Sequence, residues 1–167
     1  YVRTNTFGHA YKNFKRTGHD QIVLVDEFLG SGKTVLNRVA STNQVFIDNG
    51  VKNFTIKVKV LVATEQGAKA VTDAGIDLSC NVCLKKGITD LFPVGDVPQK
   101  LNLMKGLEAG LSDSYKGVQM TSFGYGKTES LYCREDGNVP NNVFPSFWWP
   151  FYKNGTERPV LLTRAMG

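Results

Sequence analysis

The sequence predicts an α/β fold, in which a mostly parallel sheet is flanked by helices and followed by an irregular C-terminal segment. The first observation is the uninterrupted apolar run of residues 22–25, which is typical of a strand covered on both faces of a parallel sheet. The second is that helical and strand-like patterns alternate as far as residue 84. This alternation indicates right-handed crossovers between neighbouring parallel strands.

The alternating part of the chain is predicted to contain three helices and three strands. They are a helix over residues 9–16, the strand at 22–25, a helix from Thr34 to Asn49, a strand over 54–63, a helix over 65–74 and a strand over 78–84. Beyond residue 86 one further helix is predicted over 99–111, with its buried side formed by Leu101, Met104, Leu107 and Leu111. We expect a single domain, residues 1–167, and the start at Tyr1 predicts a cut N-terminus.

The composition is that of an ordinary globular domain with a modest excess of positive charge. The 20 Lys and Arg residues exceed the 15 Asp and Glu residues by five, which favours an anionic ligand and leaves nucleic acid open as a partner. No apolar run reaches the roughly 20 residues that span a bilayer, so no membrane association is expected. Because the cysteines form no secretory framework, the expected location is the cytoplasm.

The cysteines and histidines are not spaced as metal ligands. Cys80 and Cys83 are three positions apart on a predicted strand, so their side chains are expected on opposite faces, as buried core thiols. His9 and His19 have no acid or cysteine cluster at ligand spacing. The sequence therefore predicts no metal site.

Residues 22–34 have the pattern of a ligand-binding loop. The apolar strand is followed by two acids, Asp26 and Glu27, and then by a small-residue turn that leads into a helix. In open α/β sheets, ligands bind outside the carboxyl ends of the strands. The backbone amides of the turn can converge on one phosphate, assisted by the positive end of the helix dipole. The residues expected to hold this phosphate are Gly30, Ser31, Gly32, Lys33 and Thr34.

A nucleoside triphosphatase P-loop is the competing interpretation, because Gly32, Lys33 and Thr34 match the end of that motif. The full motif requires a glycine five positions before the Gly-Lys pair, where this chain has Glu27. A carboxylate there would repel a polyphosphate by about 4 kcal/mol at about 4 Å. The acids suit a ribose instead, since carboxylates accept hydrogen bonds from vicinal hydroxyls. The pattern therefore favours a ribose 5-phosphate site.

This segment resembles the signature of the type I phosphoribosyltransferases, and looks most like the hypoxanthine-guanine branch, which also ends in Gly-Lys-Thr. The resemblance implies the Rossmann-like fold of those enzymes and phosphoribosyl pyrophosphate as the donor, with which Mg²⁺ is compatible. It implies that Asp26 and Glu27, the candidate catalytic residues, hold the ribose 2- and 3-hydroxyls, while the turn holds the 5-phosphate. The implied activity is that of a glycosyltransferase of the phosphoribosyltransferase type.

Two departures from those enzymes leave a second hypothesis open. Gly30 stands where purine-salvage enzymes place an aspartate that serves as general base, and glycine cannot move a proton. The pyrophosphate loop that type I enzymes carry upstream has no counterpart in residues 1–21. The alternative is a catalytically inactive domain that senses a nucleotide or docks partner proteins.

The C-terminal third has a more particular resemblance, to a divergent phosphoribosyltransferase-like group of bacterial conflict and antiviral defence systems. The motifs that carry it are residues 124–126, 130–132, 138–145 and 147–149. The resemblance implies an effector or component of such a system, with protein partners from the same operon. The amides of Asn141 and Asn142 can read a base edge, and the Trp148 ring can stack on a base. Core packing is the alternative role for the tryptophan.

Overall fold

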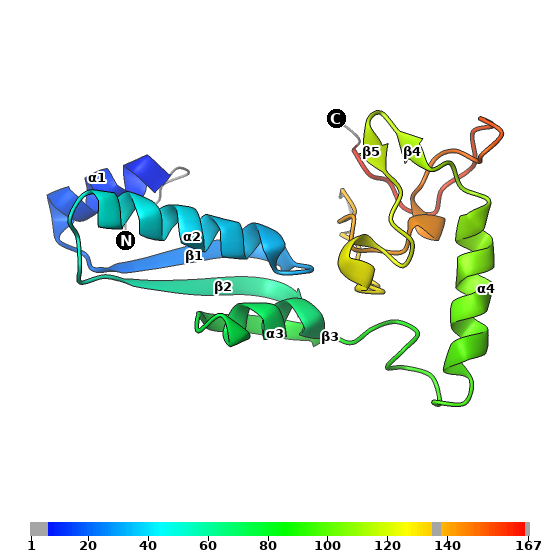
Figure 1. The fold of residues 1–167 in the computed structure, drawn as a ribbon, viewed down its shortest axis with the longest axis horizontal. Coiled ribbons are helices and arrows are strands. Elements are labelled where there is room, and N and C mark those ends of the chain that lie inside the picture. Colours follow the sequence, from blue (N-terminus) through cyan, green and yellow to red (C-terminus); the bar gives the residue numbers. More distant parts are fainter. Residues whose placement is uncertain (1–6, 135–137, 166–167) are drawn as a thin grey trace. The chain divides into compact units, whose positions relative to one another are not determined.

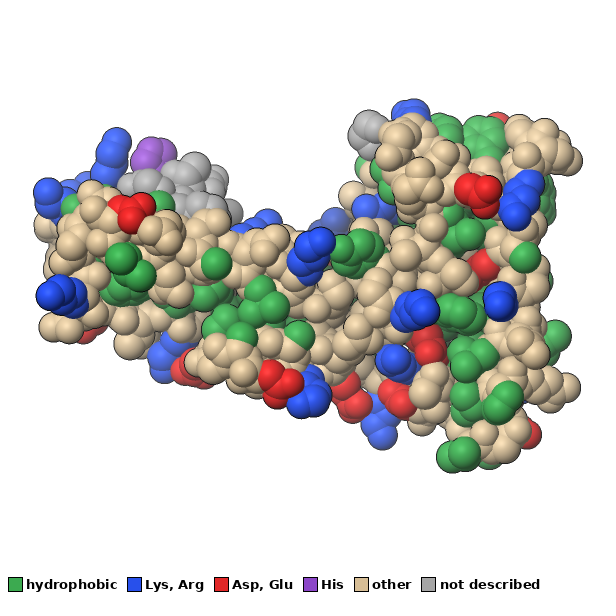
Figure 2. Space-filling model, in the orientation of Figure 1, with side chains coloured by type: hydrophobic (Ala, Val, Ile, Leu, Met, Phe, Trp, Pro, Cys, Tyr) green, Lys and Arg blue, Asp and Glu red, His purple; other side chains and the backbone are tan. Residues whose placement is uncertain are grey.

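The computed structural model describes residues 7–134 and 138–165, and Figure 1 shows its helices and strands. Contacts between residues divide the chain into two compact units. The first comprises the chain up to Ala63 together with Gly67–Val82, and the second comprises Thr64–Gln66 together with the chain from Cys83 onward. Basic side chains are dispersed over the face shown in Figure 2 rather than gathered in one patch.

The first unit is built on a three-stranded parallel sheet with helices packed on it, which confirms the predicted α/β fold class. The strands lie in the spatial order β1-β2-β3. The elements are α1 (Phe7–Thr17), β1 (Gln21–Leu29), α2 (Lys33–Asp48), β2 (Thr55–Thr64), α3 (Glu65–Asp73) and β3 (Asp77–Leu84). Their order and kind are those that the sequence predicts.

Strand β1 is longer than its apolar run, and this changes where the two acids lie. It pairs in parallel with β2, and its last residues, Phe28 and Leu29, still have partners on that strand. This pairing continues the strand past the apolar run. Asp26 and Glu27 consequently lie inside β1 rather than after it.

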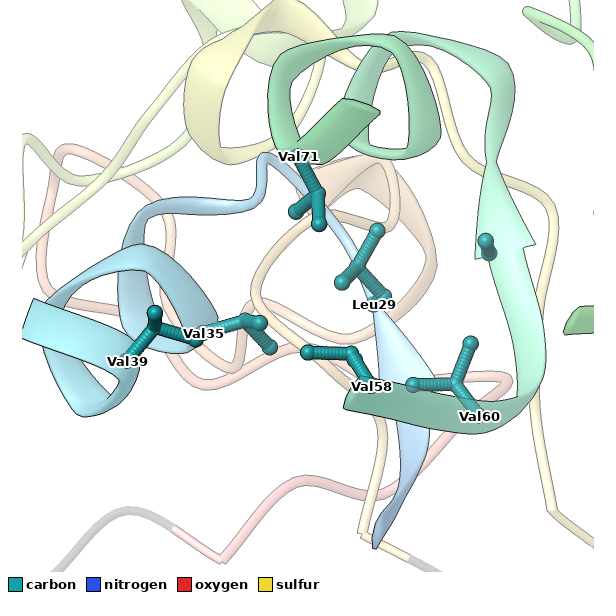
Figure 3. Packing of buried hydrophobic residues seen from close by; sticks show 7 residues of the cluster. Leu29, Val35, Val39, Val58, Val60 and Val71 are labelled. Atoms are coloured by element: carbon teal, nitrogen blue, oxygen red, sulfur yellow. The ribbon is translucent and has the colours of Figure 1, made fainter. Parts of the chain in front are cut away.

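The core of the first unit lies between the sheet and the helices α2 and α3. Side chains from β1, β2 and both helices meet in it, and Figure 3 labels Leu29, Val35, Val39, Val58, Val60 and Val71. Since α2 and α3 contribute to one cluster, they cover the same face of the sheet. On the other face Val25 and Leu61 are 75% and 56% exposed. The expectation that the apolar strand is covered on both faces is wrong, because side chains alternate along β1 and Val25 points away from both helices.

Helix α1 packs against α2 through an aromatic cluster. Phe46 of α2 is fully buried, and the ring centroids of Tyr11, Phe14 and Phe54 lie 5.7, 5.3 and 4.7 Å from its own. Aromatic pairs at such distances stabilise a core beyond the area that they bury. The amphipathic pattern that predicts a helix over residues 9–16 is therefore explained by one aromatic face.

The second unit has little regular structure, as predicted for the C-terminal segment. Its elements are α4 (Val97–Ala109), β4 (Ser114–Tyr115), β5 (Val118–Gln119) and the short 3-10 helices η1 (Tyr125–Lys127) and η2 (Pro145–Phe147). Its core is formed by Leu111, Val139, Val143, Trp148 and Trp149. The indole Nε1 of Trp149 donates to Ser112 Oγ across 2.8 Å, so the most buried aromatic side chain also satisfies its polar atom.

The predicted buried side of α4 is confirmed at Leu111, which is 2% exposed, and Leu101 and Met104 are half-buried, but the prediction is wrong at Leu107. Leu107, expected inside, is 65% exposed, whereas its neighbour Glu108 is 1% exposed. The Glu108 carboxylate accepts hydrogen bonds from Ser122 Oγ at 2.5 Å and from Phe123 N at 2.9 Å. These bonds hold Glu108 rather than Leu107 toward the interior. Burial raises the pKa of Glu108, and the two hydrogen bonds oppose that rise.

The two cysteines of β3 have different surroundings. Cys80 is half-buried against the core of the first unit, whereas Cys83 is exposed. The prediction of buried thiols is therefore wrong for Cys83. The physical reason is the alternation along β3, which directs the two side chains to opposite faces of the sheet.

Candidate functional site

The turn after β1 brings the predicted phosphate-binding residues to the N-terminus of α2. Gly30, Ser31 and Gly32 connect the strand to the helix, which begins at Lys33. Gly32 is the N-cap residue and has a φ of 83°, a left-handed conformation that favours glycine. Its carbonyl accepts a hydrogen bond from Leu36 N at 2.9 Å, which starts the helix directly after the turn.

Helix α3 supports this turn through a second glycine. A Cβ on Gly67 would overlap the carbonyl oxygen of Gly30 and lie 2.8 Å from Leu29 Cδ2. A Cβ on Gly32 would in turn lie 3.3 Å from Ala70 Cβ and 3.3 Å from the Gly67 carbonyl. The backbones of the turn and of α3 are therefore in direct contact. Sequence reasoning missed Gly67, although a glycine inside a predicted helix is a recognised sign of such a close approach.

The polar groups of the turn form a donor set that fits a phosphate monoester. The first amides of a helix have no carbonyl acceptor within it, and Gly32 offers no side chain to cap them. The Ser31 hydroxyl is half-buried, and the side chains of Lys33 and Thr34 are exposed. Amide groups, two hydroxyls and an ammonium thus lie on one turn of chain, where the helix dipole also favours an anion.

Asp26 is held by an arginine to which no sequence pattern points. Arg38 Nη1 on α2 donates to Asp26 Oδ2 across 2.7 Å, and Glu27 N donates to Asp26 Oδ1 across 2.9 Å. The ion pair is partly open to solvent, with the side chains of Arg38 and Asp26 48% and 36% exposed. Residues 26 and 38 meet because α2 runs back along β1 (Figure 1). The acids and the turn therefore lie together at the carboxyl end of one strand, with a positive charge beside the first acid.

The residues proposed to bind a base lie in the second unit and are largely engaged within it. Asn142 is 7% exposed, and its Nδ2 donates to the Tyr125 carbonyl at 2.8 Å. Trp148 is 4% exposed, and its Nε1 donates to the Val143 carbonyl at 3.0 Å. Both side chains have packing roles in this structure. Asn141 is half-buried, and its backbone carbonyl accepts a hydrogen bond from Tyr125 N. Base recognition by its side chain stays a prediction.

Residues 7–134 and 138–165 contain no group of three or more His, Cys, Asp or Glu side chains that could hold a metal ion. No helix in these residues is both long and apolar enough to cross a membrane.

Comparison with known proteins assigns the chain to a family. A family model described as PRTase-CE, a phosphoribosyltransferase-like domain, matches residues 2–157 and so covers both units. No curated protein and no solved structure matches the chain.

Proposed function

The chain belongs to the PRTase-CE family of phosphoribosyltransferase-like domains, and on that premise we propose that it binds a ribose 5-phosphate moiety, as phosphoribosyl pyrophosphate or as a nucleotide. The observation that carries the proposal is the continuity of Asp26 and Glu27 in β1 with a glycine turn at the N-terminus of α2. Acids for the sugar and amides for the phosphate then lie at adjacent positions of the chain.

In this proposal the sugar is bound by the two acids. The carboxylates of Asp26 and Glu27 accept hydrogen bonds from the ribose 2- and 3-hydroxyls. An ionised carboxylate offers about four lone-pair sites. The contacts from Arg38 and Glu27 N occupy two sites on Asp26 and leave others for a hydroxyl. The Arg38 guanidinium also keeps this carboxylate oriented before the ligand arrives.

The 5-phosphate is bound by the turn. Backbone amides between Ser31 and Thr34 donate to the phosphate oxygens, and the hydroxyls of these two residues add further donors. The Lys33 ammonium supplies positive charge at the same end of the helix. The contact between Gly67 and Gly30 fixes the position of the turn relative to α3. The backbone amides of the turn are therefore positioned by packing rather than by the ligand.

The reaction proposed for this site is transfer or cleavage at ribose C1, as expected of a phosphoribosyltransferase-type glycosyltransferase. The carboxylates of Asp26 and Glu27 would stabilise the positive charge that develops on the sugar. When bound with phosphoribosyl pyrophosphate, Mg²⁺ would neutralise the departing pyrophosphate. Gly30 offers no proton-transfer group, so an acceptor must be a nucleophile that needs no base at this position.

Similarity of the C-terminal motifs supports a role in bacterial antiviral defence, as an effector or component with protein partners from the same operon. A cytoplasmic location accords with nucleotide ligands. The catalytically inactive alternative, a nucleotide-sensing or scaffold domain, is favoured by Gly30, which cannot transfer a proton. The active enzyme and the inactive domain both bind a ligand or dock a partner at defined residues. Catalytic turnover distinguishes them, because only the active enzyme converts its ligand.

Calorimetric titration of the full chain with phosphoribosyl pyrophosphate, ribose 5-phosphate and nucleoside monophosphates tests the binding proposal. The double variant Asp26→Ala, Glu27→Ala should lose the binding heat. Asp73→Ala is the matched control, because Asp73 is an exposed acid of the same unit, paired with Lys69 at 2.8 Å and outside the site. Absence of heat with every ligand, or equal heat from the double variant, refutes the proposal. Binding without pyrophosphate release or base exchange selects the inactive alternative.

A further inference from the structure

The second unit contains an apolar pocket built wholly from its own residues. Its volume is about 270 Å³, and its wall includes side chains of α4, of the preceding loop and of the segment around η2. Leu103, Leu107 and Leu131 line it, and Lys100 is the charged residue of its lining. We call it the α4 pocket.

Large apolar side chains around the α4 pocket are open to solvent. Leu103 and Leu107, one helical turn apart, are 59% and 65% exposed, and Leu131 is 49% exposed. Phe92, in the loop before α4, also lines the pocket and is 41% exposed. Figure 2 shows hydrophobic side chains gathered over α4. Single exposed leucines are ordinary, whereas a contiguous apolar group that rims a pocket marks an interaction surface.

Helix α4 departs from an ordinary surface helix at two neighbouring positions. It buries the carboxylate of Glu108 and exposes the leucine next to it. Full burial of one leucine side chain contributes about 1.5–3 kcal/mol. A partner that covers Leu103 and Leu107 therefore gains a hydrophobic contribution that the second unit by itself leaves unused.

The charge beside the α4 pocket is positive. The Lys100 ammonium lies 5.3 Å from the ring centroid of Phe92, and both residues line the pocket. A carboxylate of a bound partner could pair with this ammonium. Lys105 is exposed on the same helix. Within α4 the acid is Glu108, which is buried, and the exposed acid Asp96 caps the helix outside the pocket lining. An acidic partner would consequently meet complementary charge at Lys100, within the lining.

We propose that the α4 pocket docks an acidic amphipathic helix of a partner protein. Its volume lies below the roughly 300–1,000 Å³ of small-molecule sites and suits one bulky apolar anchor side chain. Helices that bind in grooves place their anchors three or four residues apart, so one anchor can enter the pocket while its neighbours contact the exposed Leu103 and Leu107. An Asp or Glu of the partner helix pairs with Lys100. The proposal is independent of the ribose 5-phosphate site.

Two synthetic helical peptides test this surface. Both carry the same apolar residues at helical spacing, and one has Glu where the other has Lys. In fluorescence anisotropy the wild-type chain should bind the Glu peptide about tenfold more tightly than the Lys peptide. This ratio corresponds to a difference of about 1.4 kcal/mol in binding free energy. Lys100→Glu should reverse this preference. Leu107→Asp should weaken binding of the Glu peptide by about tenfold or more. Leu161→Asp, at an 80% exposed residue outside the lining, should leave it unchanged.

Three results would overturn the proposal. They are absence of binding to either peptide, equal affinity for both, and a preference that survives Lys100→Glu. Light scattering after size exclusion supplies a further test, since a wild-type dimer that Leu107→Asp converts to monomer would show that a second copy of the chain covers the surface. Misfolding cannot imitate the expected outcome, because Lys100→Glu is predicted to gain affinity for the Lys peptide.

Discussion

Arg38 on α2 and Asp26 on β1 form an ion pair beside the candidate phosphate-binding turn, with 2.7 Å between Nη1 and Oδ2. The other oxygen of the same carboxylate accepts the Glu27 amide at 2.9 Å. Two donors therefore orient the first of the two candidate ribose-binding acids. A preoriented acceptor loses less entropy when it binds a hydroxyl than a freely rotating one.

Arg38→Ala is expected to weaken binding of ribose 5-phosphate and phosphoribosyl pyrophosphate by up to about tenfold, because Asp26 loses a charge-assisted hydrogen bond that orients it. The same change should lower the free energy of unfolding by less than about 1 kcal/mol, since the pair is partly exposed. Calorimetry and urea denaturation measure the two effects. Tighter binding by the variant would mean that Arg38 competes with the sugar for Asp26.

Gly67→Ala is expected to lower the free energy of unfolding by about 1–3 kcal/mol and to reduce phosphate binding, because the added Cβ would push the turn at Gly30 away from α3. Gly106→Ala is the matched control. This glycine also lies inside a helix, but a Cβ there would meet nothing within 4 Å. It should increase stability by up to about 1 kcal/mol. Equal effects of the two substitutions in urea denaturation would contradict the close contact.

Glu108→Gln is expected to gain stability relative to the wild type as pH rises. Burial raises the pKa of Glu108 in the folded chain above its ordinary value of 4.5. An acid with a raised folded-state pKa leaves stability unaffected below the unfolded-state pKa. Above it, stability falls as pH rises through the folded-state pKa, because the buried group must ionise. Glutamine has no such dependence.

Thermal unfolding of both proteins between pH 4 and pH 8 measures this effect for Glu108. The difference in Tm, variant minus wild type, should increase with pH, and each kcal/mol corresponds to about 2–4 °C. Glu157→Gln, at an exposed residue, controls for the general effect of removing one negative charge. A difference in Tm that does not vary with pH would contradict the prediction.

Asn142→Ala is expected to lower the free energy of unfolding by about 1–3 kcal/mol, because it removes the buried donor to the Tyr125 carbonyl. Asn141→Ala should change it by no more than about 0.5 kcal/mol, since the hydrogen bond of Asn141 to Tyr125 N uses the backbone. If Asn141 reads a base, its variant should bind nucleotides more weakly and ribose 5-phosphate unchanged. Urea denaturation and calorimetry with both ligands distinguish the two asparagines.

The sequence alone determined the order of the elements and the position of the glycine turn between β1 and α2. Apolar periodicity and turn residues act over a few neighbouring positions, so strands, helices and a glycine N-cap leave local patterns. The acids Asp26 and Glu27 and the turn that follows them belong to one such pattern. Their proximity is a consequence of chain continuity and did not depend on the rest of the fold.

The tertiary structure decided which side chains meet across the chain. Arg38 reaches Asp26, and Gly67 reaches Gly30, only because helices pack back on the sheet. On α4, apolar periodicity placed Leu107 inside, but the hydrogen bonds from Ser122 and Phe123 hold Glu108 there instead. Contacts between distant residues depend on packing geometry and on the need of buried polar groups for hydrogen-bond partners. The spacing of residues along one segment predicts neither of these.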